Sequence, residues 1–71
     1  MVTWEQNVYS SNVSSVGYDA NTQEMYVTWS KGKTSIYAGV PEAIAQDCAN
    51  APSVGSFLNS EIKGIYAHRY A

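Results

Sequence analysis

The chain has 71 residues, of which 45% are apolar and 14% are charged, and it carries a formal net charge of −2 with a pI near 5.0. A chain this short hides only about 60% of its unfolded surface, which leaves room for one small core, and this composition predicts a globular domain instead of a disordered tail. The acidic balance argues against a general affinity for phosphate backbones, and the single cysteine excludes an intramolecular disulfide and a four-cysteine zinc site.

No stretch approaches the roughly 18 apolar residues of a membrane span, and residues 1–7 lack the basic and apolar pattern of a secretion signal. A single cysteine also fits a reducing compartment. We therefore expect a cytoplasmic protein without a membrane partner.

Residues 1–11 are assigned to an N-terminal arm, and residues 12–71 to one domain. Val2, Trp4 and Val8 recur at even positions, which suits a strand that adds to the edge of a sheet in this chain or in a partner. The other interpretation is a frayed terminus, because chain ends are often poorly ordered.

Alternation of polar and apolar residues then predicts three strands, over residues 14–19, 24–30 and 34–38. The clearest is 24–30, with Met25, Val27 and Trp29 on one face and Tyr26 and Thr28 on the other. The intervening segments 19–22 and 30–33 contain the residues that turns favour. An antiparallel meander follows.

Two short helices are predicted after the meander. Pro41 suits the first helical position, and Pro52 ends the first helix, whose apolar stripe is Val40, Ile44, Cys48 and Ala51.

Ser53 is a favourable N-cap for the second helix, and Gly64 could end it. Gly55 is expected to let this helix approach the sheet closely. The inward stripe, with Phe57 at its side, consists of Val54, Leu58, Ile62 and Ile65.

The tail alternates Tyr66, His68 and Tyr70 against smaller or charged residues, which fits a final strand along the sheet. The predicted fold is therefore α+β, a small antiparallel β-meander of three or four strands packed against two short helices.

Catalytic chemistry finds little support in this chain. His68 is the one histidine, and Cys48 lies on an apolar helical stripe, where a thiol acts as a small hydrophobe. Asp19 begins a calcium-like run, but its glycine position holds Glu24 and its twelfth position holds Ser30. We expect no enzyme activity, no metal and no cofactor.

Several motifs occur in one order along the chain: SNVSSVGYD at 11–19, MYVTW at 25–29, YAGVP at 37–41 and APSVGSFLN at 51–59. This arrangement resembles the KTSC domain family over roughly residues 11–66. That family is named after an appendage at the C-terminus of some bacterial lysyl-tRNA synthetases, and it also occurs as single-domain proteins in bacteria and phages. Its third strand usually carries a Tyr-x-Tyr motif, and here Ser35 replaces the first tyrosine.

The resemblance implies an RNA-binding role. In this chain such a role would depend on four cations and one stacking ring, which is Tyr37 or Tyr26; the cations are Lys31, Lys33, Lys63 and Arg69. Four phosphate contacts would give a salt slope of only about −3. These cations can equally be scattered solubilising charges, and Ser35 removes one ring from the expected platform. RNA binding is therefore the alternative hypothesis.

The favoured hypothesis is a non-enzymatic protein-docking module. Six Tyr, two Trp and one Phe exceed what so small a core can enclose, and exposed rings with few flanking charges are typical of interface centres. The candidate contacts are Trp4, Tyr9, Tyr26 and Tyr37, with Tyr26 and Tyr37 expected on one exposed sheet face. The expected partner is a larger host or bacterial assembly, such as RNA polymerase or a synthetase, and a homodimer is a further option.

Overall fold

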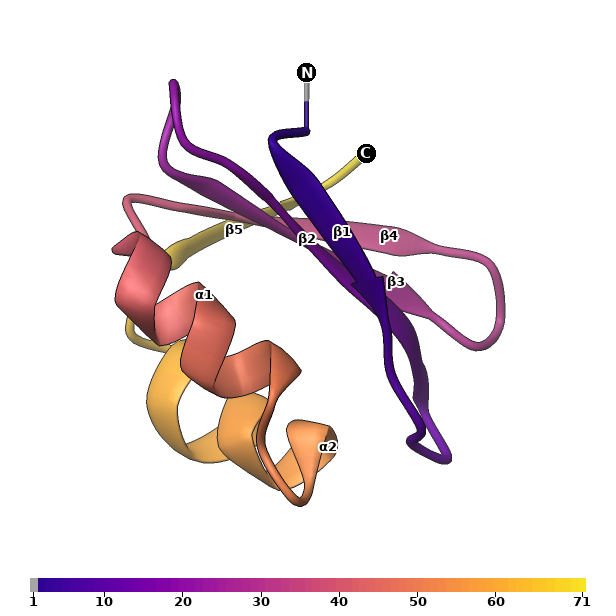
Figure 1. Ribbon diagram of the computed structural model, residues 1–71. Coiled ribbons are helices and arrows are strands. Elements are labelled where there is room, and N and C mark those ends of the chain that lie inside the picture. The colour runs from indigo at the N-terminus through magenta and orange to yellow at the C-terminus, as the bar shows by residue number, and fades with distance from the viewer. Residues whose placement is uncertain (1) are drawn as a thin grey trace.

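A computed structural model describes residues 2–71, so that Met1, the first residue of the predicted arm, lies outside the described residues. Five antiparallel strands form one sheet, and two short helical segments cover one of its faces (Figure 1). The elements are β1 (Trp4–Asn7), β2 (Val13–Asp19), β3 (Glu24–Trp29), β4 (Thr34–Ala38), α1 (Glu42–Ala49), α2 (Val54–Phe57), the π-helical turn η1 (Leu58–Ile62) and β5 (Ala67–Tyr70).

The strands lie in chain order, β1-β2-β3-β4-β5, so the sheet is a simple meander. The predicted α+β class, antiparallel sheet and two short helices are confirmed, but the sheet has five strands instead of three or four. Both chain ends contribute an edge strand: Trp4 lies opposite Tyr18, and His68 lies opposite Tyr37. The arm is therefore not frayed at residues 4–7, because these residues pair with β2.

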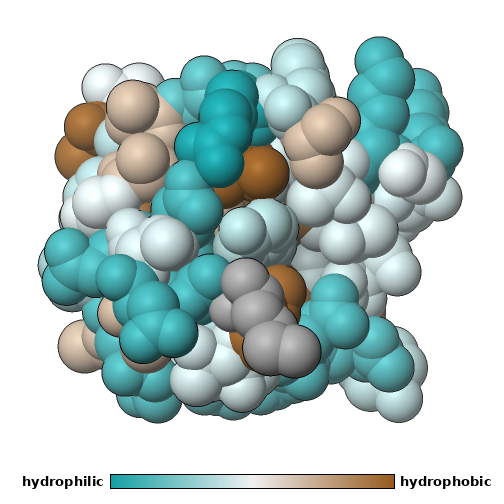
Figure 2. Space-filling view, turned by 90° about the horizontal axis from the view of Figure 1, so that it is seen from above, coloured by the Kyte–Doolittle hydropathy of each residue, from teal (hydrophilic) through white to brown (hydrophobic). Residues whose placement is uncertain are grey.

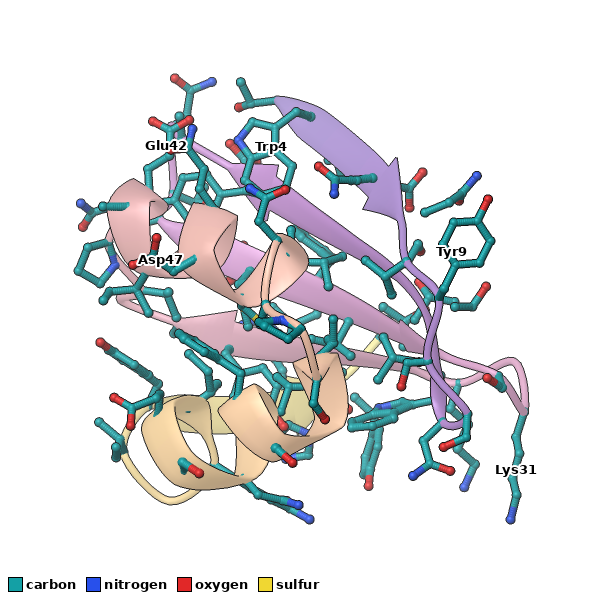
Figure 3. The ribbon with its side chains drawn as sticks, turned by 60° about the horizontal axis from the view of Figure 1, so that its bottom comes forward. Trp4, Tyr9, Lys31, Glu42 and Asp47 are labelled. Carbon is teal, nitrogen blue, oxygen red and sulfur yellow. The ribbon has the colours of Figure 1, made fainter. Side chains whose placement is uncertain are left out.

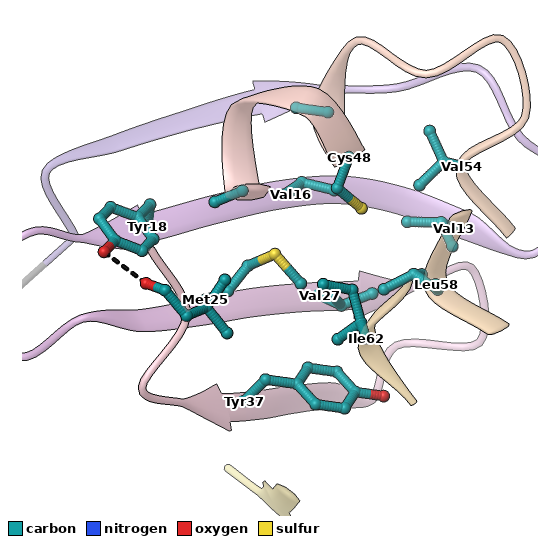
Figure 4. Packing of buried hydrophobic residues seen from close by; sticks show 13 residues of the cluster. Val13, Val16, Tyr18, Met25, Val27, Tyr37, Cys48, Val54, Leu58 and Ile62 are labelled. Atoms are coloured by element: carbon teal, nitrogen blue, oxygen red, sulfur yellow. Dashed lines mark hydrogen bonds between the residues drawn. The ribbon is translucent and has the colours of Figure 1, made fainter. Parts of the chain in front are cut away.

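The register sorts the side chains into two faces. Tyr18, Met25 and Tyr37 are cross-strand neighbours on the face that the helices cover, and all three are buried. Tyr26 and Ile36 are neighbours on the opposite face. The core lies between the sheet and the helices, as Figure 4 shows, and the Tyr18 hydroxyl donates to the Val40 carbonyl oxygen at 2.6 Å within it.

The first helix begins one residue later than expected. Pro41 is the extended N-cap residue, and Glu42 is the first helical residue. Ala45, Cys48 and Ala49 form the buried side of α1. This helix packs mainly against β2.

The second helix begins at the predicted cap, where the Ser53 hydroxyl accepts from the Ser56 backbone N–H at 3.4 Å. Its inward stripe is confirmed at Val54, Leu58 and Ile62 but is wrong at Ile65, which is 62% exposed. The reason is that the helix ends at Ile62. After it, the backbone is extended at Lys63 and left-handed at Gly64, with a φ of 81°, so Ile65 no longer lies on the helix. Within residues 2–71, no helix is long and apolar enough to span a bilayer.

Candidate functional site

A hollow of about 460 Å³ opens between the β3–β4 turn, the end of β5 and the α2–η1 segment. We call it the cationic cleft. It is lined by Ser11, Asn12, Trp29, Ser30, Lys31, Lys33, Gly55, Asn59, Lys63 and Tyr70.

Charge is distributed unevenly around this cleft. Three of the four lysine and arginine side chains line it, namely Lys31, Lys33 and Lys63. None of the six aspartate and glutamate side chains lines it. The cleft is therefore locally positive on a protein whose net charge is negative. Such a site attracts anions that the remaining surface repels.

Two different elements supply these lysines. Lys31 and Lys33 flank Gly32, whose φ of 99° permits the tight turn after β3. The backbone N–H of Trp29 donates to the Lys33 carbonyl oxygen across this turn at 2.7 Å. Lys63 follows the π-helical turn, and its N–H donates to the Leu58 carbonyl five residues earlier at 2.7 Å. Lys31 extends from the tip of the turn (Figure 3).

Aromatic rings form part of the same cleft. The Lys33 ammonium lies 5.7 Å from the centre of the Tyr70 ring, within the range of a cation–π contact. The Trp29 indole N–H donates to the Ser35 hydroxyl at 2.7 Å, which fixes the orientation of the indole ring. Ser35, where the resemblance led us to expect a tyrosine, is thus buried and orients a neighbouring ring.

A second hollow adjoins the cleft and shares Trp29, Lys63 and Tyr70 with it. We call it the ring hollow, and its other lining residues are Ser35, Tyr37, Gly64, Tyr66 and His68.

The rings within the ring hollow touch one another. The centres of Tyr37 and His68 are 5.0 Å apart, and His68 meets Tyr70 edge-on at 4.7 Å. Burial is the main cause that raises the pKa of the Tyr37 phenol above its ordinary value of 10.0. Lysines and mutually contacting aromatic rings therefore lie side by side.

Arg69 does not join the three lysines. It lies on the opposite face of β5, where its guanidinium pairs with the Glu24 carboxylate at 2.6 Å. The hydrogen bond from Arg69 is the main cause that lowers the pKa of Glu24. The predicted set of four cations is thus divided between two faces because alternate residues of a strand point in opposite directions.

The four predicted docking residues do not form one surface. Tyr37 is 2% exposed, whereas Tyr26 is half-buried on the other face, so the expectation of one face that carries both is wrong. Met25 is the residue of β3 that lies opposite Tyr37, so Tyr26 points to the other side of the sheet. Tyr9 is fully exposed on the β1–β2 loop (Figure 3).

Trp4 belongs to the packing of α1 on the sheet. Its ring stacks on Tyr18 at a centre distance of 5.9 Å and an interplanar angle of 26°. Its indole N–H donates to the Glu42 carboxylate at 3.1 Å, near the start of α1. These contacts leave Tyr9 as the one freely exposed ring among the four.

The helix-free face of the sheet is mostly hydrophilic. Figure 2 shows this side of the molecule largely in hydrophilic and neutral colours, with apolar colour only in small separate patches. It carries the Glu24–Arg69 ion pair and the Tyr26 hydroxyl, which lies 3.4 Å from Glu24. These features are typical of a solvated surface.

The thiol of Cys48 is not suited to act as a nucleophile. The side chain is fully buried, and desolvation raises the pKa of its thiol to about 11. Among residues 2–71, no cluster of three or more histidine, cysteine or acidic side chains is arranged to hold a metal ion.

Sequence reasoning missed Trp29, Tyr70, Asn59 and Gly55 as site residues. Asn59 and Gly55 precede Lys63 at intervals of four, a spacing that places them on one side of a helix and could have indicated a shared surface. Gly55 was instead expected to allow close packing on the sheet. That expectation is wrong, because a Cβ atom at this position would meet nothing within 4 Å.

Comparison with known proteins agrees with this architecture. The sequence model of the KTSC domain matches residues 9–66. A protein from Tsukamurella paurometabola is 34% identical over 58 residues, which cover 82% of this chain and 87% of that protein. The crystal structure of a KTSC domain protein from Yersinia pestis superposes with a TM-score of 0.86 at 35% identity and covers 96% of both chains.

Proposed function

The chain belongs to the KTSC domain family, and we propose that it is a non-enzymatic module that binds single-stranded RNA through the cationic cleft. The observation that carries the proposal is the gathering of three lysines beside two aromatic rings, with no carboxylate side chain among the lining residues. Proteins that hold single strands combine these two features, a positive groove for the backbone and rings for the bases. We place this activity in the cytoplasm.

Each part of the site would contact a different part of the ligand. Lysine ammonium groups are compact charges that suit phosphate oxygens. The faces of Trp29 and Tyr70 would stack on bases, which is worth about 1–3 kcal/mol per base and depends little on sequence. The proposed activity is therefore weak, sensitive to salt and tolerant of sequence.

A single strand suits this site better than a duplex. The rings lie in a hollow, and bases that are paired in a duplex cannot stack there without leaving their partners. Within residues 2–71, no long basic helix is available to enter a groove, since α1 spans eight residues and α2 four. We therefore expect preference for unpaired RNA over a duplex of the same length.

A matched pair of tyrosine variants tests the proposal. Both Tyr70 and Tyr9 are exposed, but only Tyr70 lines the cleft. Binding of a fluorescent single-stranded RNA, measured by anisotropy, should weaken by about 1–3 kcal/mol in Tyr70→Ala and stay unchanged in Tyr9→Ala. Equal effects of the two variants, or no binding by the unaltered protein, would contradict the proposal.

A protein-docking module is the second candidate function, and the exposed ring of Tyr9 favours it. This ring is 105% exposed and lies next to a shallow hollow between β1 and α1, lined in part by Val8 and Asn50. An exposed aromatic side chain is a typical centre of an interface. The partner would be a larger host or bacterial assembly, or a second copy of this chain. Loss of such a partner in Tyr9→Ala, with Tyr70→Ala unaffected, would favour docking over RNA binding.

A further inference from the structure

Gly55 lines the cationic cleft and has no side chain to extend into it. It is the second residue of α2 and lines the hollow together with Asn59 and Lys63. A Cβ atom built at this position meets no other atom within 4 Å, and the backbone there is helical, a conformation that any residue adopts. Neither packing nor backbone geometry therefore requires glycine at position 55.

Glycine in a helix costs stability relative to alanine, so its presence here is unfavourable for folding. A side chain at position 55 would instead project into the hollow that the lysines surround. Lys31 and Lys33 approach this hollow from the β3–β4 turn, and Lys63 approaches it from the end of η1. Gly55 thus lines the same hollow as lysines of both elements.

We propose that the bare backbone of Gly55 leaves room for one RNA phosphate between the lysines of the turn and Lys63. This inference rests on the proposed function and assigns one part of the ligand to one part of the site. The adjoining ring hollow, which shares Trp29 and Tyr70 with the cleft, then receives the base of the same nucleotide. The size of residue 55 therefore controls entry of the phosphate.

The test compares two leucine variants on one helix. Gly55→Leu places a branched side chain in the hollow, whereas Ser56→Leu adds a side chain of the same size at the next, exposed position, which lies outside the cleft. Affinity for a single-stranded RNA of about six nucleotides should fall at least about tenfold in Gly55→Leu and stay within about twofold in Ser56→Leu. Gly55→Ala, whose melting temperature should be equal to or above that of the unaltered protein, gives a smaller loss.

A second ligand separates the phosphate from the base. An abasic oligonucleotide with the same number of phosphates keeps the charge of the RNA and lacks its bases. Gly55→Leu should reduce affinity for this ligand by the same factor as for RNA, because the blocked space receives a phosphate. A loss confined to the ligand with bases would overturn the assignment.

Two different results would overturn the role of Gly55 and the RNA-binding function. Unchanged RNA affinity in Gly55→Leu, with a cooperative melt and with weaker binding in Tyr70→Ala, would overturn the role of Gly55 alone. Absence of RNA binding in the unaltered protein would overturn both.

Discussion

Replacement of Lys63 by glutamine should change the salt dependence of RNA binding by a defined amount. For single strands, log K falls with log[salt] with a slope of about −0.7 per phosphate contact, so three lysines give about −2 and two give about −1.4. Between about 50 and about 200 mM salt, affinity should then fall about 18-fold in the unaltered protein and about sevenfold in Lys63→Gln. Anisotropy titrations at four or five salt concentrations measure both slopes.

Arg69→Gln is the matched control for that measurement. It removes the same charge, but Arg69 lies on the other face and pairs with Glu24. Its slope should stay at about −2, because no phosphate contact is lost. If Arg69→Gln flattens the slope as much as Lys63→Gln does, the effect is one of overall charge and the reasoning from the cleft is refuted.

Three further predictions concern the fold. Tyr18→Phe leaves the buried Val40 carbonyl without its donor and should lower the free energy of unfolding by about 1–3 kcal/mol, and an unchanged urea midpoint would contradict this. Cys48 should react with a thiol reagent only after unfolding, since it is buried with a pKa raised to about 11, and rapid labelling of the native protein would contradict its placement. Because Arg69 lowers the Glu24 pKa below its ordinary value of 4.5, their pair stabilises the fold above that pH, and the contribution is lost as the pH falls through the lowered value. Arg69→Gln should therefore lower the urea midpoint near about pH 6 and have a smaller effect as the pH falls below 4.5, and a loss that stays the same over this range would contradict the assignment.

Much of the fold could be predicted from local sequence. The alternation around Met25 and Val27 determines which side of β3 is buried, because a strand with one covered face must keep its apolar residues on that side. Ser53 likewise marks the start of α2, since its hydroxyl satisfies a free N–H of the first turn. These signals depend only on neighbours in the chain.

The candidate site could not be assembled in the same way. Tyr70 reaches the cleft because β5 pairs with β4 and places it opposite Ser35, a contact between residues far apart in the sequence. Lys63 reaches it through a π-helical turn, which no simple periodicity predicts. Alternation along the tail separates Arg69 from Tyr70, but only the pairing of β5 with β4 shows which of the two faces carries the cleft.

The structure also gives Ser35, which replaces one tyrosine of the expected stacking platform, a different role. Ser35 removes one ring, but its hydroxyl holds the indole of Trp29 at the edge of the cleft. The rings that remain accessible there come from β3 and β5. Their identity follows from side-chain packing and not from the motif.

Chemical-shift mapping with a short single-stranded RNA locates the binding site residue by residue. The largest changes should fall on the backbone amides of Lys31, Lys33, Gly55 and Lys63 and on the indole N–H of Trp29, with the indole N–H of Trp4 unaffected. Changes centred on Tyr9, or none at RNA concentrations that saturate weak binders, would contradict RNA binding in the cleft.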